Sequence, residues 1–412
     1  MTVGLVSLGC AKNAADLEVR AGRLISDGWT LAADPDRCDT LIVNTCAFIA
    51  SARDETEREI RRALSLKRKG QVKRVVVTGC YPERYPERAS MFPGVDSWEG
   101  VPKRFDCQRV PGLRFSGKAF AYLKIAEGCA HRCSYCAIPA IRGRYRSRPL
   151  RAVVKEACDF VRTGVRELNV IAQDPMLYGV DMDPAIDLVT LLRALDRIRG
   201  DFRVRVLYSY PSEITDGFLD WMRTSPHAVK YVDVPLQHTD PAILKAMARG
   251  SAVKASLAAA ERIRAAVPGV TLRTTVMTGF PGETAASFAR LLSDVKRMEF
   301  DHLGVFAYSP EEGTAAAKMP GRPPAKVAEA RALKVMAAQR RIWDRKAKAM
   351  LGQEFRALVV APGVARLESQ APAVDGVVRL DVGPDASVGE FVTVLITGVR
   401  GYDFFGKALS GR

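Results

Sequence analysis

The 412-residue sequence predicts an α/β fold in three parts: an N-terminal parallel α/β domain, a partial (β/α)6 barrel and a small C-terminal all-β barrel. Two observations lead to this division. Up to residue 350, apolar runs rich in β-branched residues alternate with segments of helical periodicity, which is the pattern of parallel sheets. From residue 351 to residue 412 only short strand-like runs with turn signals remain, at residues 355–361, 376–381 and 390–397, which is typical of small β-barrels.

Three strand-like runs in the first hundred residues each end at a cysteine. These cysteines are Cys10, Cys46 and Cys80, and helical segments at residues 16–26 and 52–69 separate the strands. Because parallel strands point the same way, we expect the three thiols to lie together at the carboxyl edge of the sheet, where ligand crevices form. They are predicted to hold a metal cluster. The alternative is that each is a small buried side chain at the end of its strand.

Six further strand-like runs follow, with helical segments among them. The runs cover residues 122–126, 166–172, 203–208, 231–235, 270–278 and 302–308, and the helical segments cover residues 153–163, 187–198, 241–248, 254–266 and 284–298. Six such units predict an open (β/α) barrel with its site at the carboxyl ends of the strands. A stretch without periodicity at residues 102–119 is interpreted as a linker.

The loop after the first barrel strand carries Cys129, Cys133 and Cys136 at CxxxCxxC spacing. Three thiolates can hold three irons of a [4Fe–4S] cluster and leave the fourth iron open for chemistry. The alternatives are zinc bound together with His131, or three cysteines that cluster without a metal. A closed structural zinc site takes four protein ligands, and no fourth cysteine completes one.

Cysteine usage and charge indicate the compartment and the partners. Nine cysteines, an odd number, and an N-terminus that looks like a strand rather than an export signal favour reduced thiols in the cytoplasm. No apolar run is long enough to span a bilayer, so no membrane partner is expected. The net charge of +16 favours an anionic partner such as nucleic acid or the ribosome.

The C-terminal module differs in charge from the rest of the chain. Seven acids and six bases give residues 351–412 a net charge of −1, whereas residues 1–350, which end in a basic helical stretch at 326–348, carry +17. An RNA-binding module is normally the most basic part of a protein. One interpretation is that Asp375, Asp381, Asp385 and Glu390 form an acidic face for a basic protein partner, and the alternative is that these acids are simply a solvated surface.

Three cysteines lie outside both sets. Cys158 falls in a helical segment and is expected to be buried on its apolar face, whereas Cys38 and Cys107 lie in polar, turn-rich segments. None of the three is expected to bind a metal.

Local sequence motifs indicate a family. The motifs are SLGCAKN at residues 7–13, VNTCAF at 43–48, YLKIAEGC at 122–129, IPAIRG at 138–143, YVDVPLQH at 231–238 and GFPGE at 279–283. Together with the two cysteine sets and the terminal β-module, they make the whole chain resemble the radical S-adenosylmethionine (SAM) methylthiotransferases, and most of all the branch that modifies ribosomal protein S12. Departures from the family pattern at residues 175–176 and 248–250 concern details of the substrate pocket.

The resemblance implies a division of labour among domains. Residues 1–101 would carry an auxiliary [4Fe–4S] cluster on Cys10, Cys46 and Cys80, residues 120–350 a radical SAM cluster on the CxxxCxxC thiols, and residues 351–412 a TRAM-like β-barrel. Polar and glycine residues at the remaining strand ends are predicted to line a SAM pocket, because they can approach or hydrogen-bond a ligand. They are Gln173, Asp174, Gln237, Gly279 and Glu283.

The implied function is transfer of a methylthio group to the β-carbon of an aspartate of S12, with SAM as both methyl donor and radical source. The enzyme would be a monomer that needs an electron donor and acts on S12 either free or in the small ribosomal subunit. One alternative is methylthiolation of an adenosine in transfer RNA, which the +16 charge favours and the −1 module disfavours. Another is a non-catalytic RNA-binding protein with a metal cluster, which would leave the barrel without a purpose. No catalytic side chain is assigned.

Overall fold

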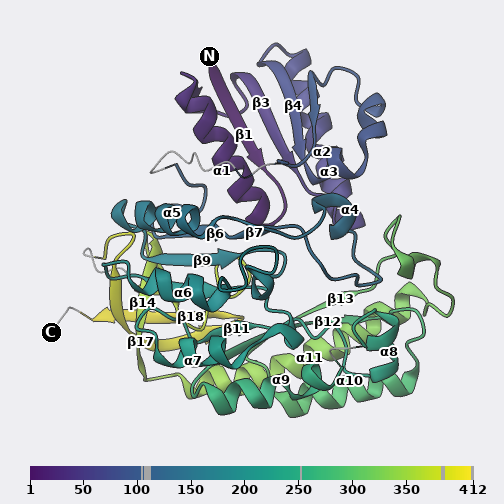
Figure 1. Ribbon diagram of the computed structural model, residues 1–412, viewed down its shortest axis with the longest axis vertical. Coiled ribbons are helices and arrows are strands. Elements are labelled where there is room, and N and C mark those ends of the chain that lie inside the picture. Colours follow the sequence, from purple (N-terminus) through teal and green to yellow (C-terminus); the bar gives the residue numbers. More distant parts are fainter. Residues whose placement is uncertain (104, 106–112, 251–252, 382–385, 410–412) are drawn as a thin grey trace.

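The structure is a computed structural model that describes residues 1–103, 105, 113–250, 253–381 and 386–409. Figure 1 shows three parts: an N-terminal domain at the top in purple and blue, a central barrel in teal and green, and a yellow β-module at the lower left. This arrangement confirms the predicted fold class. The predicted linker at residues 102–119 lies partly outside the described residues.

The N-terminal domain is a five-stranded parallel sheet in the order β2-β1-β3-β4-β5. Its strands are β1 (Thr2–Ser7), β2 (Thr30–Leu31), β3 (Cys38–Thr45), β4 (Val72–Gly79) and β5 (Ser97–Glu99), and its helices are α1 (Ala11–Ser26), α2 (Ala50–Arg68), α3 (Cys80–Arg84) and the short 3-10 helix η1 (Pro86–Met91). The central strands β1, β3 and β4 are rich in buried valine, leucine and isoleucine, as expected for strands that are covered on both faces. Their shared direction places all three strand-end cysteines at one edge.

The barrel contains six parallel strands, hydrogen-bonded as β6-β9-β10 and β11-β12-β13. They are β6 (Phe120–Lys124), β9 (Glu167–Ile171), β10 (Arg203–Val206), β11 (Tyr231–Asp233), β12 (Thr271–Thr278) and β13 (His302–Ala307). A parallel bridge between Val204 and Ala228 joins the two halves. The major helices are α5 (Leu150–Arg162), α6 (Leu188–Asp196), α7 (Asp216–Thr224), α8 (Pro241–Ala246), α9 (Val253–Ala266) and α10 (Ala285–Met298). Of these, only α7 was not predicted from the sequence.

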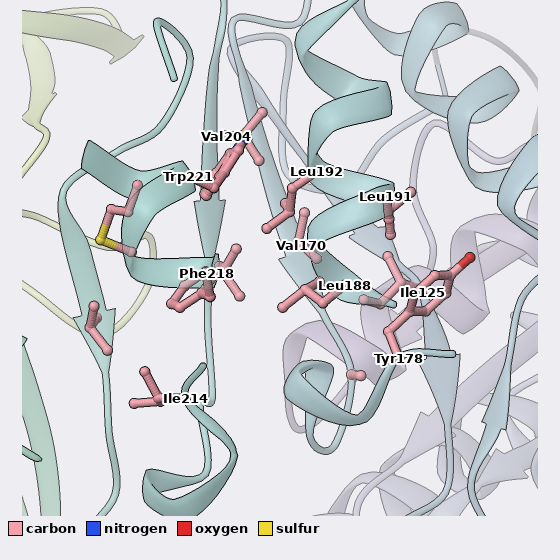
Figure 2. Packing of buried hydrophobic residues seen from close by; sticks show 14 of the residues in the cluster. Ile125, Val170, Tyr178, Leu188, Leu191, Leu192, Val204, Ile214, Phe218 and Trp221 are labelled. Carbon is pink, nitrogen blue, oxygen red and sulfur yellow. The ribbon is translucent and has the colours of Figure 1, made fainter. Parts of the chain in front are cut away.

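The barrel core lies between the strands and the helices around them. Figure 2 shows Leu188, Leu191 and Leu192 of α6 beside Val170 of β9, and Trp221 of α7 beside Val204 of β10. All six side chains are buried. The leucine spacing follows the helical repeat, so one face of α6 covers the sheet. This packed core supports the strands from the helix side, and loops follow the carboxyl ends of the strands.

The C-terminal module is a closed barrel in the order β14-β15-β16-β18-β17. Its strands are β14 (Glu354–Ala361), β15 (Val364–Leu367), β16 (Val378–Asp381), β17 (Phe391–Arg400) and β18 (Asp403–Leu409). The sequence prediction missed β15 and β18. The module follows α11 (Ala325–Ala349), and Trp343 near the end of α11 packs on Phe404 and donates a hydrogen bond to the Gly401 carbonyl at 2.9 Å. Among the described residues, no helix, α11 included, is long and apolar enough to cross a bilayer.

A buried ion cluster fixes the C-terminal module to the barrel. Glu167, at the start of β9, is completely buried and accepts hydrogen bonds from Arg203 at 2.6 Å, Arg205 at 3.3 Å and Arg366 at 3.1 Å. Burial alone would raise the pKa of Glu167, but these three guanidinium groups hold it well below its usual range. Because Arg366 belongs to β15, the cluster joins the two domains.

The loop after β15 contradicts one expectation from the sequence. The Asp375 side chain is 1% exposed and accepts hydrogen bonds from Tyr231 at 2.7 Å and Arg273 at 2.8 Å, both in barrel strands. Asp375 is therefore part of the domain contact and not of an exposed acidic face. Asp381 and Glu390 are exposed as expected, and Asp385 lies outside the described residues.

A second carboxylate joins the barrel to the N-terminal domain. Glu311, which follows β13, is buried and pairs with Arg53 and, at 3.3 Å, with Arg84. Its other oxygen accepts a hydrogen bond at 3.0 Å from the backbone amide of Ala50, the first residue of α2. A carboxylate at a helix N-terminus satisfies a free amide and interacts favourably with the helix dipole.

The prediction for Cys158 was wrong. This thiol is exposed, because the buried face of α5 is formed by Val153, Glu156, Ala157 and Phe160. Cys38, expected in a polar segment, is instead buried at the start of β3. Cys107 lies outside the described residues.

We expect Glu167→Gln to destabilise the protein by about 3 to 5 kcal/mol, because three buried guanidinium groups would lose the anion that they share. Urea unfolding at pH 7 measures the loss, and hydrogen exchange should show β14–β18 opening first. The exposed Glu55→Gln is the control and should change little.

The difference in unfolding free energy between wild type and Glu167→Gln should decrease at low pH. A carboxylate with a depressed folded-state pKa contributes stability above its unfolded pKa of about 4.3 and loses it as pH falls. The gap between wild type and Glu167→Gln should therefore shrink below about pH 4. A gap that stayed constant to pH 3 would show that Glu167 is not held as a carboxylate.

Candidate functional site

The N-terminal cysteines meet around one asparagine. Cys10 caps α1, Cys46 directly follows β3, and Cys80 begins α3. The Asn13 side chain is buried and donates to the Thr45 carbonyl at 2.8 Å, while its Oδ1 lies 3.6 Å from the Cys80 sulfur and 3.9 Å from the Cys10 sulfur. The structure thus brings the three predicted thiols together at the carboxyl edge of the sheet.

Gly9 makes this close approach possible. Its φ is +89°, and a Cβ there would lie 2.8 Å from the Cys46 Cβ. Any other residue at position 9 would push the Cys46 strand end away or strain the backbone. The glycine before Cys10 is therefore required by the packing of the thiols.

The CxxxCxxC thiols lie in a loop held at both ends. The two-stranded pair β7 (Ala126–Glu127) and β8 (Arg146–Ser147) closes the loop, which also contains α4 (Ile138–Arg142). A Cβ on Gly128 would lie 2.1 Å from the Arg144 carbonyl oxygen, so only glycine fits beside Cys129. The Ser134 hydroxyl donates to the Ala246 carbonyl at 2.8 Å, which ties the loop to α8.

Burial raises the pKa of several of these thiols. The pKa rises to about 11 for Cys80 and Cys129 and to about 12 for Cys136. Metal binding at these positions would therefore displace protons from the thiols. Two cations lie close enough to balance thiolate charge: Arg142, 3.2 Å from the Cys80 sulfur, and Arg249, 4.0 Å from the Cys133 sulfur.

The donor sets have the ligand type and number that an iron–sulfur cluster with one open iron takes. Among the residues that the structure describes, no three His, Cys, Asp or Glu side chains are arranged to hold one metal ion. Each thiolate of a [4Fe–4S] cluster binds a different iron, so its ligands are spaced more widely. Soft thiolates, nearby cations and three ligands in each set all fit such a cluster.

A buried charge network joins the two thiol sets. Arg142, six residues after Cys136, pairs with Asp16 of α1 at 2.6 Å and with Glu127 at 3.1 Å. Its other nitrogen donates to Asn13 at 2.6 Å and contacts the Cys80 sulfur. The helix that ends the CxxxCxxC loop therefore reaches the N-terminal thiols directly, and the sequence analysis had not identified this role.

Lys124 completes the network on the barrel side. It pairs with Asp16 and, at 2.8 Å, with Glu127. Burial alone would raise the pKa of Glu127, but Lys124 and Arg142 lower it to about 2. Two carboxylates and two cations in one buried site keep the charges balanced.

Two of the five predicted SAM-pocket residues lie beside the CxxxCxxC loop. The Gln173 amide donates to Glu127 at 2.8 Å, and the Asp174 carboxylate is 2.6 Å from the ring nitrogen of His131. His131 stacks on Tyr210 with ring centroids 3.7 Å apart. The Arg249 guanidinium lies 4.1 Å from the centroid of the same Tyr210 ring. The stack was not predicted, because its members are far apart in sequence.

The other three predicted residues follow the strands β11 and β12. Gln237 has a φ of +67° at the end of its strand, where its backbone pairs with Thr275 and Met277. The Glu283 carboxylate accepts from the Gly279 amide and lies 3.3 Å from Arg331 of α11. The assignment of all five residues to SAM remains a prediction.

The N-terminal domain places one lysine in the barrel mouth. The Lys12 ammonium lies 3.7 Å from the centroid of the Tyr208 ring and 3.4 Å from the carbonyl oxygen of Ala172. Burial lowers the pKa of Lys12. Tyr208 follows β10 and has a φ of +72°, an uncommon conformation for a bulky residue that is often found at functional sites.

Comparisons with known proteins agree with the division seen in the structure. Residues 2–100 match the Uncharacterized protein family UPF0004, residues 123–295 match the Radical SAM superfamily, and residues 352–409 match the TRAM domain. A solved structure of the radical S-adenosylmethionine methyltransferase TsrM from Kitasatospora setae, with cobalamin and a [4Fe–4S] cluster bound, is similar in fold. It covers 77% of each chain with a TM-score of 0.56 and 18% identity.

Curated relatives match along nearly the whole chain. Proteins named Ribosomal protein uS12 methylthiotransferase RimO are 40% identical over 430 residues in Moorella thermoacetica, 39% over 441 in Geobacter sulfurreducens and 38% over 436 in Carboxydothermus hydrogenoformans. Each alignment covers at least 98% of this chain and of the relative. With its UPF0004, radical SAM and TRAM domains in the same order, this chain belongs to the RimO family of radical SAM methylthiotransferases, enzymes that transfer a sulfur-containing group.

Proposed function

We propose that the protein transfers a methylthio group to the β-carbon of an aspartate of ribosomal protein S12. The observation that carries the proposal is the pair of three-thiol sets, one of which is contacted at Cys80 by Arg142, a buried arginine six residues after the last cysteine of the other set. Transfer of sulfur to an unactivated carbon needs a radical source and a sulfur carrier close together. The near full-length similarity to proteins named for uS12 supports the choice of substrate.

Two [4Fe–4S] clusters would be held by the thiols. Cys129, Cys133 and Cys136 would hold the cluster at which SAM binds, and Cys10, Cys46 and Cys80 would hold the auxiliary cluster within residues 1–101. With SAM and an electron, the first cluster supplies a 5′-deoxyadenosyl radical, which is chemistry that belongs to the cofactor. SAM also supplies the methyl group.

The protein side chains would position the reactants and exclude water. Gln173, Asp174, Gln237, Gly279 and Glu283 would line the SAM pocket, the first two through their contacts with Glu127 and His131. The Arg142 network would fix the distance between the two thiol sets, since each of its charges is buried and paired. Fixed geometry of this kind supplies much of the rate advantage when two reacting groups must meet.

The partner would be S12, either free or within the small ribosomal subunit, in the cytoplasm where ribosomes assemble. The exposed Asp381 and Glu390 of the C-terminal module could face a basic protein. Exposed cations on α11, among them Lys334, Arg341 and Lys348, could lie against ribosomal RNA. An electron donor completes the set of partners, and the enzyme would act as a monomer.

The first test is metal content. Protein purified or reconstituted without oxygen should hold about eight irons, because two separate three-thiol sets are present. Changing Cys129, Cys133 and Cys136 together to alanine should remove about half of the iron. The exposed Cys158→Ala is the matched control and should keep all of it. Zinc without iron under these conditions would refute the cluster assignment.

The second test separates the roles of the two sets. Cys46→Ala should still cleave SAM to 5′-deoxyadenosine under reducing conditions, because the CxxxCxxC thiols are intact, but it should form no methylthio product. High-performance liquid chromatography of the nucleoside and mass spectrometry of S12 give the two readouts. A Cys46→Ala variant that retained the iron of the CxxxCxxC cluster and yet lost cleavage would contradict this division.

The third test concerns the substrate. The reconstituted enzyme, given S12 and bulk transfer RNA in competition, should place the methylthio group on an aspartate of S12 and leave adenosines unmodified. Mass spectrometry of the digested products identifies the modified residue. Methylthio-adenosine with unmodified S12 would replace the proposal by the transfer-RNA alternative.

A further inference from the structure

Lys12 occupies an unusual place between the two thiol sets. It is the second residue of α1 and lies two positions after Cys10, yet its ammonium contacts residues that follow barrel strands. One contact is the Ala172 carbonyl after β9, next to Gln173 and Asp174, and the other is the Tyr208 ring after β10. Lys12 thus points from the N-terminal domain into the barrel mouth.

Lys12 differs from the neighbouring cations in having no carboxylate partner. Lys124 and Arg142 share Asp16 and Glu127 in the buried network. Lys12 forms no ion pair with any residue in the described part of the chain, where its partners are a carbonyl oxygen and an aromatic ring. A partly buried ammonium without an anion is costly, so the position is suited to an anionic ligand that arrives from outside.

The nearby acids Asp233 and Glu127 interact favourably with the Lys12 charge but form no ion pair with it. Asp233, at the end of β11, is buried within the barrel and lies 3.8 Å from Arg273. Glu127 is already paired with Lys124 and Arg142. Among the described residues, no carboxylate therefore forms an ion pair with the ammonium, which lies beside the residues that follow β9 and β10.

We propose that Lys12 binds the side-chain carboxylate of the target aspartate. The inference rests on the proposed function, because it takes the substrate to be an aspartate side chain. The β-carbon of aspartate is bonded directly to its carboxylate carbon, so a carboxylate held by Lys12 places the reacting carbon beside Cys10 and the barrel mouth. Lys12 is then a substrate-binding residue that determines specificity for an acidic side chain.

The contacts of Lys12 suit this task. The Tyr208 ring lies against one side of the ammonium and the Ala172 carbonyl accepts one of its hydrogens, which leaves hydrogens for a carboxylate. A neutral adenine base offers no anion to this site. SAM also carries a carboxylate, and the experiment must distinguish the two sources.

The test compares Lys12→Met with wild type in the cluster-loaded protein. The probes are two fluorescent S12 peptides that differ only in having aspartate or asparagine at the target position, and anisotropy gives their affinities. Lys12→Met should weaken the aspartate peptide about 10- to 100-fold, the cost of one charge-assisted hydrogen bond, and leave the asparagine peptide unchanged. Lys12→Arg should retain part of the preference for aspartate.

Controls separate this inference from the proposed function. Iron content, SAM affinity and SAM cleavage without peptide should equal wild type in Lys12→Met, and the exposed Lys155→Met should bind both peptides normally. Three outcomes would overturn the inference about Lys12 but not the proposed function. They are equal weakening of both peptides, weaker SAM binding, and iron loss in both Lys12→Met and Lys12→Gln. If wild type neither bound nor modified the aspartate peptide or S12, the proposed function would fail together with it.

Discussion

The contacts of the Arg142 guanidinium are the interaction on which the arrangement of the site depends. Its partners come from three places: Asp16 and Asn13 on α1, Glu127 before the CxxxCxxC loop, and Cys80 at the start of α3. A buried cation is tolerated only when its hydrogen-bonding groups are satisfied, so these partners must converge for the guanidinium to be buried at all. The requirement couples the folding of two domains to the alignment of two thiol sets, since neither domain supplies enough partners by itself.

Charged contacts of the same kind hold the other domain boundaries. Glu311 joins the barrel to α2 and α3, and Glu167 joins it to the C-terminal module. Apolar surfaces would tolerate sliding, because hydrophobic attraction has no direction. Paired charges with hydrogen-bond geometry fix the orientation of the two surfaces. A protein that must hold two reactive centres at a set distance is therefore stabilised in the required arrangement by such pairs at its domain boundaries.

The sequence predicted those features of the fold that depend on residues close together in the chain. Strand runs that end in Cys10, Cys46 and Cys80 imply a shared edge once the strands are parallel, and the structure shows that edge. The short strands β15 and β18 escaped notice because four to seven residues beside turns give little periodicity. The roles of Asp375 and Arg142 could not be interpreted from sequence. Arg273 and Tyr231, which donate to Asp375, lie 102 and 144 positions away, and the partners of Arg142 lie 15 to 129 positions away.

The ion cluster at Glu167 has a consequence for how the chain is made. Translation delivers Glu167, Arg203 and Arg205 long before Arg366, and the Asp375 that pairs with Arg273 comes later still. Domains usually fold as they emerge, the N-terminal ones first. Here the barrel would wait with an incomplete end until the last β-strands leave the ribosome. A nascent chain that stalled before residue 366 would leave Glu167 without Arg366 and Arg273 without Asp375, a state that quality-control proteases could distinguish from the finished enzyme.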